Sequence, residues 1–190
     1  NFLQDKIVNG KVTAVCDINP KKFEFFKEKF GDSIKYFTDA EEMFKSGECD
    51  VVMICTPHYI HPDLAILALD NNLNCIVEKP AGVYTLAVRD MIAAADRNKD
   101  VTFAMMFNQR TNHVYRKMKE IVASGELGEI KRVNWIITDW YRTQAYHDSS
   151  AWRSNWKGEG GGVLINQNPH QIDLWQWMFG MPSKIYARAS

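Results

Sequence analysis

The sequence lacks the features that would identify several large classes of protein. No apolar run in its 190 residues approaches the ~20 residues that a membrane-spanning helix needs, and the residues given show no secretory signal pattern. Its 23 basic residues are balanced by 23 acidic residues, so the formal net charge is +0. We therefore expect neither nucleic acid nor an anionic membrane as a partner.

The cysteines also lack the CxxC spacing of a redox or zinc site. They are Cys16, Cys49, Cys55 and Cys75. Three of them end or sit within predicted strands, where a free cysteine behaves as a small apolar residue. Free core cysteines are typical of a reducing compartment, so we expect a cytoplasmic protein.

Apolar residues make up 46% of the chain, and in its first half they form short runs that alternate with helical patterns. The predicted strands are residues 12–16, 35–37, 51–55, 75–78 and 101–106. The predicted helices are 20–30, 38–47, 62–69 and 85–98, with Asn19, the pair Thr38 and Glu41, and Thr85 as N-terminal caps. This alternation predicts a doubly wound α/β domain whose parallel sheet is covered on both faces and lacks its first strand.

Beyond Phe107 the pattern changes, which predicts a domain boundary there. A helix over 111–123 precedes an alternating run over 131–140 that is typical of a sheet with one packed face. An aromatic, glycine-rich loop leads to a helix over 169–179, and a last strand begins at Lys184. The one-faced run needs a cover, so we expect a homodimer or homotetramer.

One apolar run, Asn74 to Val77, ends abruptly in Glu78, Lys79 and Pro80. Ligands of open parallel sheets lie beyond the carboxyl ends of the strands. Lys79 would be delivered to that edge with only Glu78 as an evident neutralising neighbour, so we interpret the lysine as functional. The alternative is a strand-end salt bridge to solvent.

Two other strand ends carry candidate residues. An acid such as Asp17, after the first predicted strand, can hydrogen-bond the adenosine ribose hydroxyls of a dinucleotide and repel a 2′-phosphate. An ordinary turn aspartate is an equal alternative. Thr56, Pro57 and His58, with His61, follow another strand. Two histidines three apart could ligate a metal, but no third ligand lies at a useful spacing, so we expect a ligand-facing turn and no metal.

The second half of the chain carries one more candidate site. Glu159 precedes three glycines, which let a backbone approach a ligand closely, and His170 lies in the first turn of the last predicted helix. The positive end of the helix dipole favours the neutral ring, which is a competent general base. Asp173, one turn further on, could orient the ring. The alternative is a histidine that caps its own helix.

Three motifs now stand together: Thr56-Pro57-x3-His61, then Glu78-Lys79-Pro80, then Gly160-Gly161-Gly162-Val163-Leu164 with His170-x2-Asp173. This combination resembles the Gfo/Idh/MocA oxidoreductases over nearly the whole chain. The resemblance implies an NAD(P)-binding Rossmann domain in residues 1–107. It also implies part of a substrate and oligomerisation domain in residues 108–190, an α/β domain with a large open, mostly antiparallel sheet.

The same resemblance implies roles for individual residues. Lys79 would bind the substrate hydroxyl and assist proton transfer, and His170 would be the acid/base. The implied cofactor contacts are Asp17, Thr56, Pro57, His58, His61, Glu78, Lys79 and Asn108. Asp17 favours NAD over NADP, and the Lys79–Pro80 peptide bond would be cis.

The implied function is that of an NAD-dependent oxidoreductase, which transfers a hydride between nicotinamide and a secondary alcohol of a sugar, sugar derivative or cyclitol. Aromatic and hydrogen-bonding groups suit such a substrate. The expected substrate contacts are Lys79, Tyr141, Arg142, His147, Trp152, Arg153, Asn166 and His170. The alternatives are an NAD-dependent glycosidase that uses transient oxidation and a non-catalytic dinucleotide-binding protein.

The chain departs from the family pattern in two ways. Asn166 stands where many members place Asp, four residues before the histidine. An asparagine can orient the imidazole but supplies no negative charge, so His170 would be a weaker base. The GxGxxG strand–turn is absent from these residues, and we therefore expect a partial chain of a longer enzyme.

Overall fold

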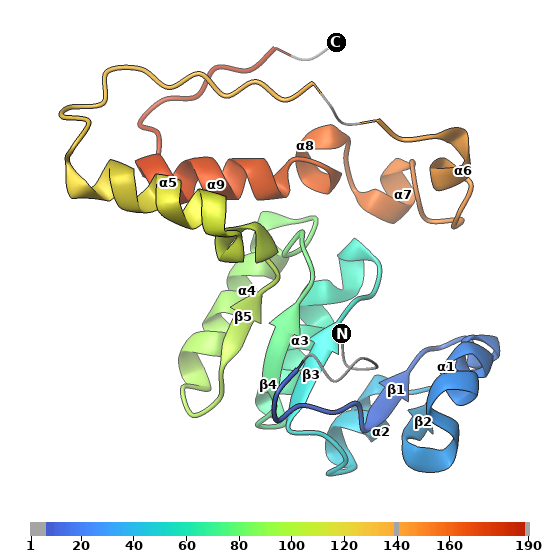
Figure 1. Ribbon diagram of the computed structural model, residues 1–190. Coiled ribbons are helices and arrows are strands. Elements are labelled where there is room, and N and C mark those ends of the chain that lie inside the picture. The colour runs from blue at the N-terminus through green and yellow to red at the C-terminus, as the bar shows by residue number, and fades with distance from the viewer. Residues whose placement is uncertain (1–6, 139–140, 189–190) are drawn as a thin grey trace. The chain divides into compact units, whose positions relative to one another are not determined.

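The computed structural model describes residues 7–138 and 141–188 (Figure 1). Their contacts divide them into two compact units. The first unit comprises the described residues up to Thr56 together with Ile60–Met105, and the second comprises Pro57–Tyr59 and the described residues from Met106. The turn that follows the third strand therefore belongs by its contacts to the second unit.

The first unit is built on five short parallel strands. They are β1 (Ala14–Cys16), β2 (Lys35–Phe37), β3 (Val51–Ile54), β4 (Asn74–Val77) and β5 (Phe103–Met105). β1 pairs with β2, and β3, β4 and β5 form a second sheet in that order. In a doubly wound sheet the first strand lies between these two groups, and no strand among the described residues joins them. The predicted parallel Rossmann architecture is confirmed.

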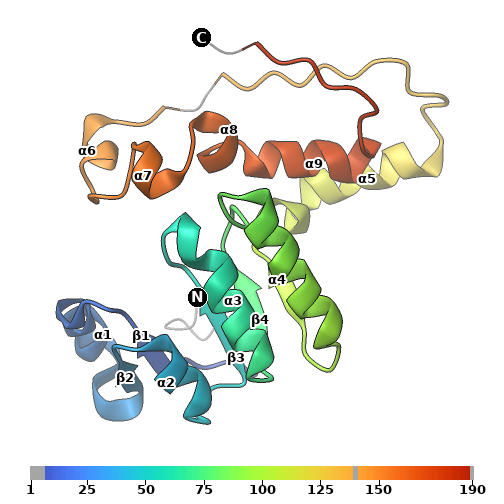
Figure 2. The ribbon, with the colours of Figure 1, turned by 180° about the vertical axis from the view of Figure 1, so that it is seen from behind.

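Helices connect the strands of this unit. The connections are η2 (Pro20–Lys22) with α1 (Phe23–Phe30) and η3 (Gly31–Ser33), then α2 (Ala40–Lys45), α3 (His61–Asp70) and α4 (Thr85–Arg97). Right-handed crossovers place α3 and α4 side by side against one face of the three-stranded sheet (Figures 1 and 2). The core comprises Val52, Ile54, Cys75 and Val77 from the strands and Ala65, Ala68, Leu69, Met91 and Ala94 from the helices.

The prediction that helices cover both faces of the sheet is wrong for β3. Its side chains alternate between the core and solvent, and Val51 and Met53 are 50% and 48% exposed. The crossovers from β3 to β4 and from β4 to β5 run in the same direction along the sheet, so α3 and α4 lie on the same face. The strand is therefore packed on one face only among the described residues.

Two predicted helix caps are each displaced by one residue. The N-cap of α2 is Asp39, not Thr38, and its carboxylate accepts a hydrogen bond from the Glu42 backbone N–H at 2.9 Å. A carboxylate at the N-terminus also interacts favourably with the helix dipole, which a hydroxyl does not match. Thr85 is the first residue of α4 rather than its cap. The predicted cap at Asn19 is confirmed, since its side chain accepts from Lys21 N–H at 3.1 Å.

The cysteines are free thiols, but not all of them lie in the core. Cys75 is fully buried in β4, and burial raises the pKa of its thiol to about 12. Cys16 and Cys49 are half-buried, whereas Cys55, directly after β3, is exposed. The core interpretation therefore holds for Cys75 and is wrong for Cys55, because Cys55 continues the exposed side of β3 that carries Val51 and Met53.

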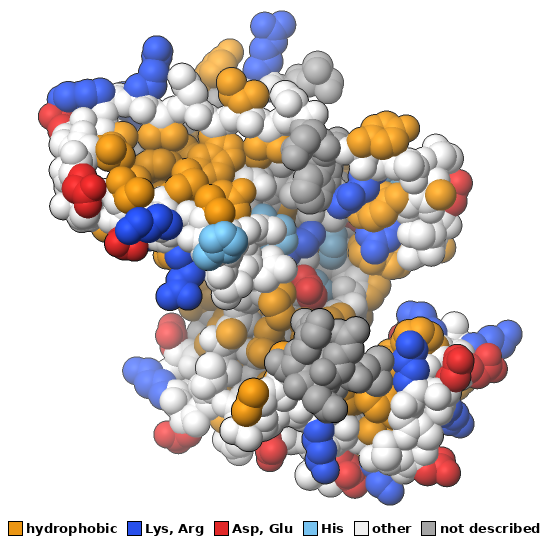
Figure 3. Space-filling view, viewed as in Figure 1, with side chains coloured by type: hydrophobic (Ala, Val, Ile, Leu, Met, Phe, Trp, Pro, Cys, Tyr) orange, Lys and Arg blue, Asp and Glu red, His pale blue; other side chains and the backbone are white. Residues whose placement is uncertain are grey.

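The regular elements of the second unit are helices throughout its described residues. Its elements are η4 (His58–Ile60, shared with the first unit), η5 (Asn108–Thr111), α5 (His113–Ser124), α6 (Gln144–His147), α7 (Trp156–Glu159), α8 (Val163–Asn166) and α9 (Pro169–Phe179). α5 and α9 pack side by side (Figure 1). Figure 3 shows apolar side chains gathered over α5, where Val114 and Met118 are 51% and 39% exposed. The homo-oligomer that would cover such a surface stays a prediction.

The predicted strands of this unit are not observed. Residues 131–138 and 184–188 belong to no strand, while 139–140 and 189 lie outside the described residues. A strand requires a hydrogen-bonded neighbour, and the described part of this unit offers none. The predicted packed face is nevertheless present at Trp135. Its ring stacks on Tyr115 at 6.3 Å, and its Nε1 donates to the Gln171 side chain at 3.2 Å.

Candidate active site

The carboxyl ends of β3 and β4 present the Glu78-Lys79-Pro80 segment. The Glu78 N–H donates to the Ile54 carbonyl at 3.0 Å, which extends the parallel ladder one residue beyond β4. Lys79 follows immediately and is half-buried, and its N–H donates to the Glu78 carboxylate at 3.1 Å. The Lys79–Pro80 bond is cis, as predicted. The lysine thus lies where ligands of parallel sheets bind.

His61 lies between the two turns that follow these strands. It is the first residue of α3 and only 1% exposed. Its Nδ1 lies 2.8 Å from the Pro80 carbonyl oxygen and its Nε2 lies 2.7 Å from the Thr56 carbonyl oxygen. Carbonyl oxygens only accept hydrogen bonds, so a ring nitrogen can bond them only as a donor. A neutral ring has one N–H and donates to one of the two carbonyls, whereas a doubly protonated ring donates to both. The ring thereby joins the turn after β3 to the turn after β4.

Two polar groups of the first unit suit a dinucleotide. The Thr56 hydroxyl is buried at the end of β3 and has no hydrogen-bond partner in the described part of the chain. A buried hydroxyl without a partner is unfavourable, and an oxygen of a ligand would satisfy it. The Asp17 carboxylate accepts from Asn19 N–H at 2.9 Å and from Lys22 Nζ at 2.8 Å. These hydrogen bonds stabilise the turn that follows β1. The carboxylate oxygens keep further lone pairs that can accept hydrogen bonds from ribose hydroxyls.

In the second unit, α7 fixes the turn that contains His58. His58 is 4% exposed, its Nδ1 lies 2.8 Å from the Glu159 carbonyl oxygen, and its ring meets Trp152 edge-on at 5.2 Å. The Tyr59 hydroxyl donates to the Trp156 carbonyl at 2.8 Å. These contacts leave little of the His58 ring exposed, whereas Pro57 beside it is exposed.

A buried carboxylate lies next to Asn166. Glu159 and Asn166 are 5% and 7% exposed, and the Asn166 amide donates to the Glu159 carboxylate in a short contact. The sequence interpretation treated Asn166 as the loss of a negative charge and missed Glu159. The signal available in the sequence was an acid directly before the Gly160–Gly162 run. The structure therefore places an acidic side chain beside the asparagine.

This pair can be tested by exchanging the acid and the amide between positions 159 and 166. Asn166→Asp would set two buried carboxylates within hydrogen-bond distance, which should lower the free energy of unfolding by about 2 kcal/mol. Glu159→Gln with Asn166→Asp restores one amide and one carboxylate, so the double variant should recover most of that loss. Urea unfolding of the two single variants and the double variant measures the coupling. Additive losses would contradict the pairing.

His170 lies in the first turn of α9, as predicted, and its ring meets Phe107 edge-to-face at 6.3 Å. Asp173 is engaged in a way that the sequence did not indicate. Its carboxylate accepts from Arg110 Nε at 2.8 Å and from a terminal guanidinium nitrogen of the same arginine at 2.5 Å. This hydrogen bonding raises the pKa of Arg110 above its usual value. The proposed coupling of Asp173 to His170 stays a prediction.

Part of the predicted substrate loop gathers around a residue that was not predicted, Tyr146. The Arg153 guanidinium lies over the rings of Tyr146 and Trp152 at 4.7 and 4.6 Å and donates to the Tyr146 hydroxyl at 2.8 Å. The Arg142 guanidinium lies over the same tyrosine at 4.6 Å and donates to Gln167 at 3.0 Å. An aromatic–arginine cluster of this kind can stack on a ring and donate to its hydroxyls.

Other predicted residues lie outside this cluster. Tyr141 is 80% exposed, Asn108 is exposed within η5, and the His147 ring contacts the Ser154 hydroxyl. Within the described ranges no group of three or more histidine, cysteine or acidic side chains could hold a metal, and no helix is long and apolar enough to span a membrane.

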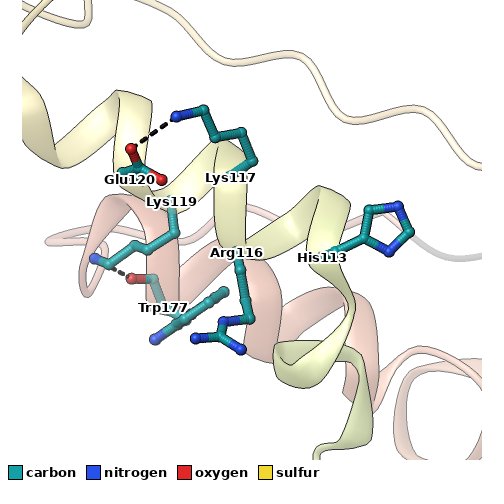
Figure 4. Close-up of a pocket in the computed structure, with 6 residues that line it drawn as sticks. All are labelled: His113, Arg116, Lys117, Lys119, Glu120 and Trp177. Atoms are coloured by element: carbon teal, nitrogen blue, oxygen red, sulfur yellow. Dashed lines mark hydrogen bonds and ion pairs between the residues drawn. The ribbon is translucent and has the colours of Figure 1, made fainter.

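A separate cavity of about 500 Å³ lies along α5, lined by His113, Arg116, Lys117, Lys119, Glu120 and Trp177 (Figure 4). Two of its basic side chains have partners within the cavity wall. Lys117 pairs with Glu120 at 2.7 Å, and Lys119 donates to the Trp177 carbonyl at 2.6 Å. None of the predicted site residues lines this cavity.

Two family models match the chain. Residues 1–107 match the model described as "Oxidoreductase family, NAD-binding Rossmann fold", and residues 115–190 match the GFO/IDH/MocA C-terminal domain. The chain belongs to the Gfo/Idh/MocA oxidoreductase family. Its first domain is accordingly an NAD-binding Rossmann domain, which confirms the predicted cofactor.

Relatives in this Gfo/Idh/MocA family include two curated dehydrogenases. The 1-carboxy-3-chloro-3,4-dihydroxycyclo hexa-1,5-diene dehydrogenase of Comamonas testosteroni is 31% identical over 173 residues, covering 91% of this chain and 42% of that protein. The D-glucoside 3-dehydrogenase of Escherichia coli is 27% identical, covering 91% of this chain and 48% of that protein.

A solved structure is similar as well. The WlbA dehydrogenase of Bordetella pertussis, crystallised with NADH and UDP-GlcNAcA, matches with a TM-score of 0.76 and 25% identity, covering 88% of this chain and 47% of that chain. The chain thus spans less than half the length of these relatives.

Proposed function

We propose that the complete protein is an NAD-dependent oxidoreductase that acts on a secondary alcohol of a sugar, sugar derivative or cyclitol. The observation that carries the proposal is Lys79, half-buried directly beyond the last ladder bond of β4, in a domain of an NAD-binding oxidoreductase family. A cation at the carboxyl edge of such a sheet can stabilise an alkoxide that develops on a bound alcohol.

In this proposal NAD supplies the hydride acceptor when it is bound. His170 takes the proton of the substrate hydroxyl, and the Lys79 ammonium stabilises the oxygen as the alcohol becomes a carbonyl. The residues assigned to the cofactor side are Asp17, Thr56, Pro57, His58, Glu78 and Asn108. The Asp17 carboxylate and the buried Thr56 hydroxyl, which has no partner among the described residues, support this assignment.

The proposed substrate class rests on the relatives and on the aromatic–arginine cluster. The relatives are named for a D-glucoside and a dihydroxylated carbocycle, and the solved structure holds a nucleotide-linked sugar acid. Trp152 and Arg153 offer a ring face and a guanidinium, which suit a polyhydroxylated ring that carries an acid. Asn166 and Tyr141 complete the proposed substrate side.

Cofactor preference tests the first part of this function. Titration of the complete gene product with NADH and with NADPH, followed by tryptophan fluorescence, should show NADH binding at least about 10-fold tighter, because an acid at position 17 repels a 2′-phosphate. Asp17→Asn should reduce that ratio, while Asp32→Asn, an exposed acid in η3, should leave it unchanged.

The chemistry is tested by incubating the complete protein with NAD and a panel of sugars and cyclitols. Accumulation of NADH with a keto product would support the oxidoreductase. Release of an aglycone from a glycoside, without net formation of NADH, would instead indicate the alternative function of an NAD-dependent glycosidase. Binding of neither dinucleotide, by folded protein free of prebound cofactor, would remove both enzymatic functions.

A further inference from the structure

His61 occupies an unusual position for a residue assigned to cofactor contact. It is 1% exposed, which leaves almost no ring surface for a ligand. Each ring nitrogen lies within hydrogen-bond distance of a backbone carbonyl, Pro80 on one side and Thr56 on the other. The ring is therefore committed to the protein backbone rather than to a bound molecule.

The two carbonyls belong to turns that carry proposed functional groups. Thr56 presents the buried hydroxyl at the end of β3, and Pro80 is bonded directly to Lys79. Both carbonyls lie past the last ladder bond between these strands, the one from Glu78 N–H to the Ile54 carbonyl. Beyond that point the sheet no longer sets the spacing of the two turns. A side chain that bonds both carbonyls can set it instead.

An imidazole ring suits this task because it is rigid and its two nitrogens face different acceptors, both of which it bonds when each nitrogen carries a hydrogen. A carboxamide presents its donors from one nitrogen only. The ring is also held in place by its own element, since His61 begins α3, whose Ala65, Ala68 and Leu69 are 0% exposed in the core. Through the His61 ring, the turns after β3 and β4 are both tied to α3. This helix cannot shift without disturbing the core.

We infer that His61 is a positioning residue of the proposed oxidoreductase. Its ring ties the turn after β3 to the turn after β4 and thereby holds the Lys79 ammonium and the Thr56 hydroxyl at a fixed separation. It does so without contacting cofactor or substrate. The inference rests on the proposed function, because the value of the fixed separation lies in aligning Lys79 with an alcohol on the nicotinamide.

Two substitutions test the role. His61→Phe keeps a similar ring volume and removes both nitrogens, and it should lower kcat by about 100-fold, as expected for a catalytic group displaced by about 1 Å. His61→Gln keeps a donor for one carbonyl and should lose less, about 10-fold. NADH affinity, measured by tryptophan fluorescence, should fall by less than about 10-fold in both, since the displaced Thr56 hydroxyl is only one of several groups assigned to the cofactor.

Leu69→Ala is the matched control. Leu69 lies in the same helix and is 0% exposed, but it contacts the core rather than the two turns. Its loss should destabilise the domain, with kcat unchanged at a temperature where all variants are folded. A kcat loss in Leu69→Ala equal to that in His61→Phe would overturn the inference, as would a parallel 100-fold loss of NADH affinity in His61→Phe.

Hydrogen exchange separates this inference from the proposed function. In the protein without cofactor, His61→Gln should speed amide exchange selectively in peptides covering residues 55–60 and 78–84, whereas Leu69→Ala should speed it throughout the first unit. If the wild-type protein oxidises no alcohol, the proposed function fails, and selective exchange still decides whether His61 fixes the turns. Unchanged exchange in both peptides would show that it does not.

Discussion

Lys79→Ala should lower kcat by about 10²- to 10⁴-fold, the range in which a positioned proton-transfer or charge-stabilising group contributes. Lys79 is half-buried directly after the extended ladder of β4, so no other cation on that strand end can replace it. NADH affinity should stay within about 3-fold, because the lost interaction is made with the substrate oxygen. Steady-state kinetics with a substrate found by screening, and fluorescence titration with NADH, measure the two effects.

Two comparisons make this result specific to the ammonium group. Lys79→Met keeps the length of the side chain without its charge and should be as inactive as the alanine variant. Lys45→Ala removes an exposed lysine of α2 that pairs with Glu41, and it should leave kcat unchanged. Normal turnover in Lys79→Ala would remove Lys79 from the mechanism.

Asp173→Ala should lower the free energy of unfolding by about 3 kcal/mol, the lower end of the range for breaking a buried ion pair. The Asp173 side chain is 7% exposed and accepts two hydrogen bonds from Arg110. The arginine side chain is 39% exposed and can regain water when its partner is removed, which keeps the loss at that lower end. Urea unfolding followed by tryptophan fluorescence measures the change.

A double-mutant cycle with Arg110→Ala isolates the pair. The coupling should be about 1.5–3 kcal/mol, the range for hydrogen bonds to charged groups, whereas the exposed pair of Lys117 and Glu120 should couple by less than about 0.5 kcal/mol. Asp173→Asn also tests the proposed coupling to His170. A shift in the pH profile of kcat would support that coupling, and a loss of stability with an unchanged profile would restrict Asp173 to its ion pair with Arg110.

Local chemistry made several elements predictable from sequence. β2 has the predicted bounds, and the other strands differ from them by one or two residues, because short β-branched runs between turn residues are strong local signals. The cap at Asn19 and the start of α9 at Pro169 were likewise read from residues adjacent in the chain. The family motifs were visible for the same reason, since each consists of a few consecutive residues.

Cap positions were less predictable, because neighbouring residues compete for the same backbone donors. Thr38 and Asp39 both suit an N-cap, and the carboxylate occupies it. The run over 131–140 shows why a strand cannot always be predicted from its own residues. Its alternation predicted one packed face, and Trp135 does pack, on Tyr115, but a ladder depends on a second strand that the run itself does not contain.

The sequence alone therefore determined the order of the elements in the first unit, the Rossmann architecture and the strand ends that carry candidate residues. Only the tertiary structure decided the partners of the site residues. Asp173 meets Arg110, 63 positions away, and His58 meets Glu159, 101 positions away. The physical reason is that an ionised or hydrogen-bonding side chain bonds whichever partner folding brings within about 3 Å, and spacing along the chain does not encode that distance.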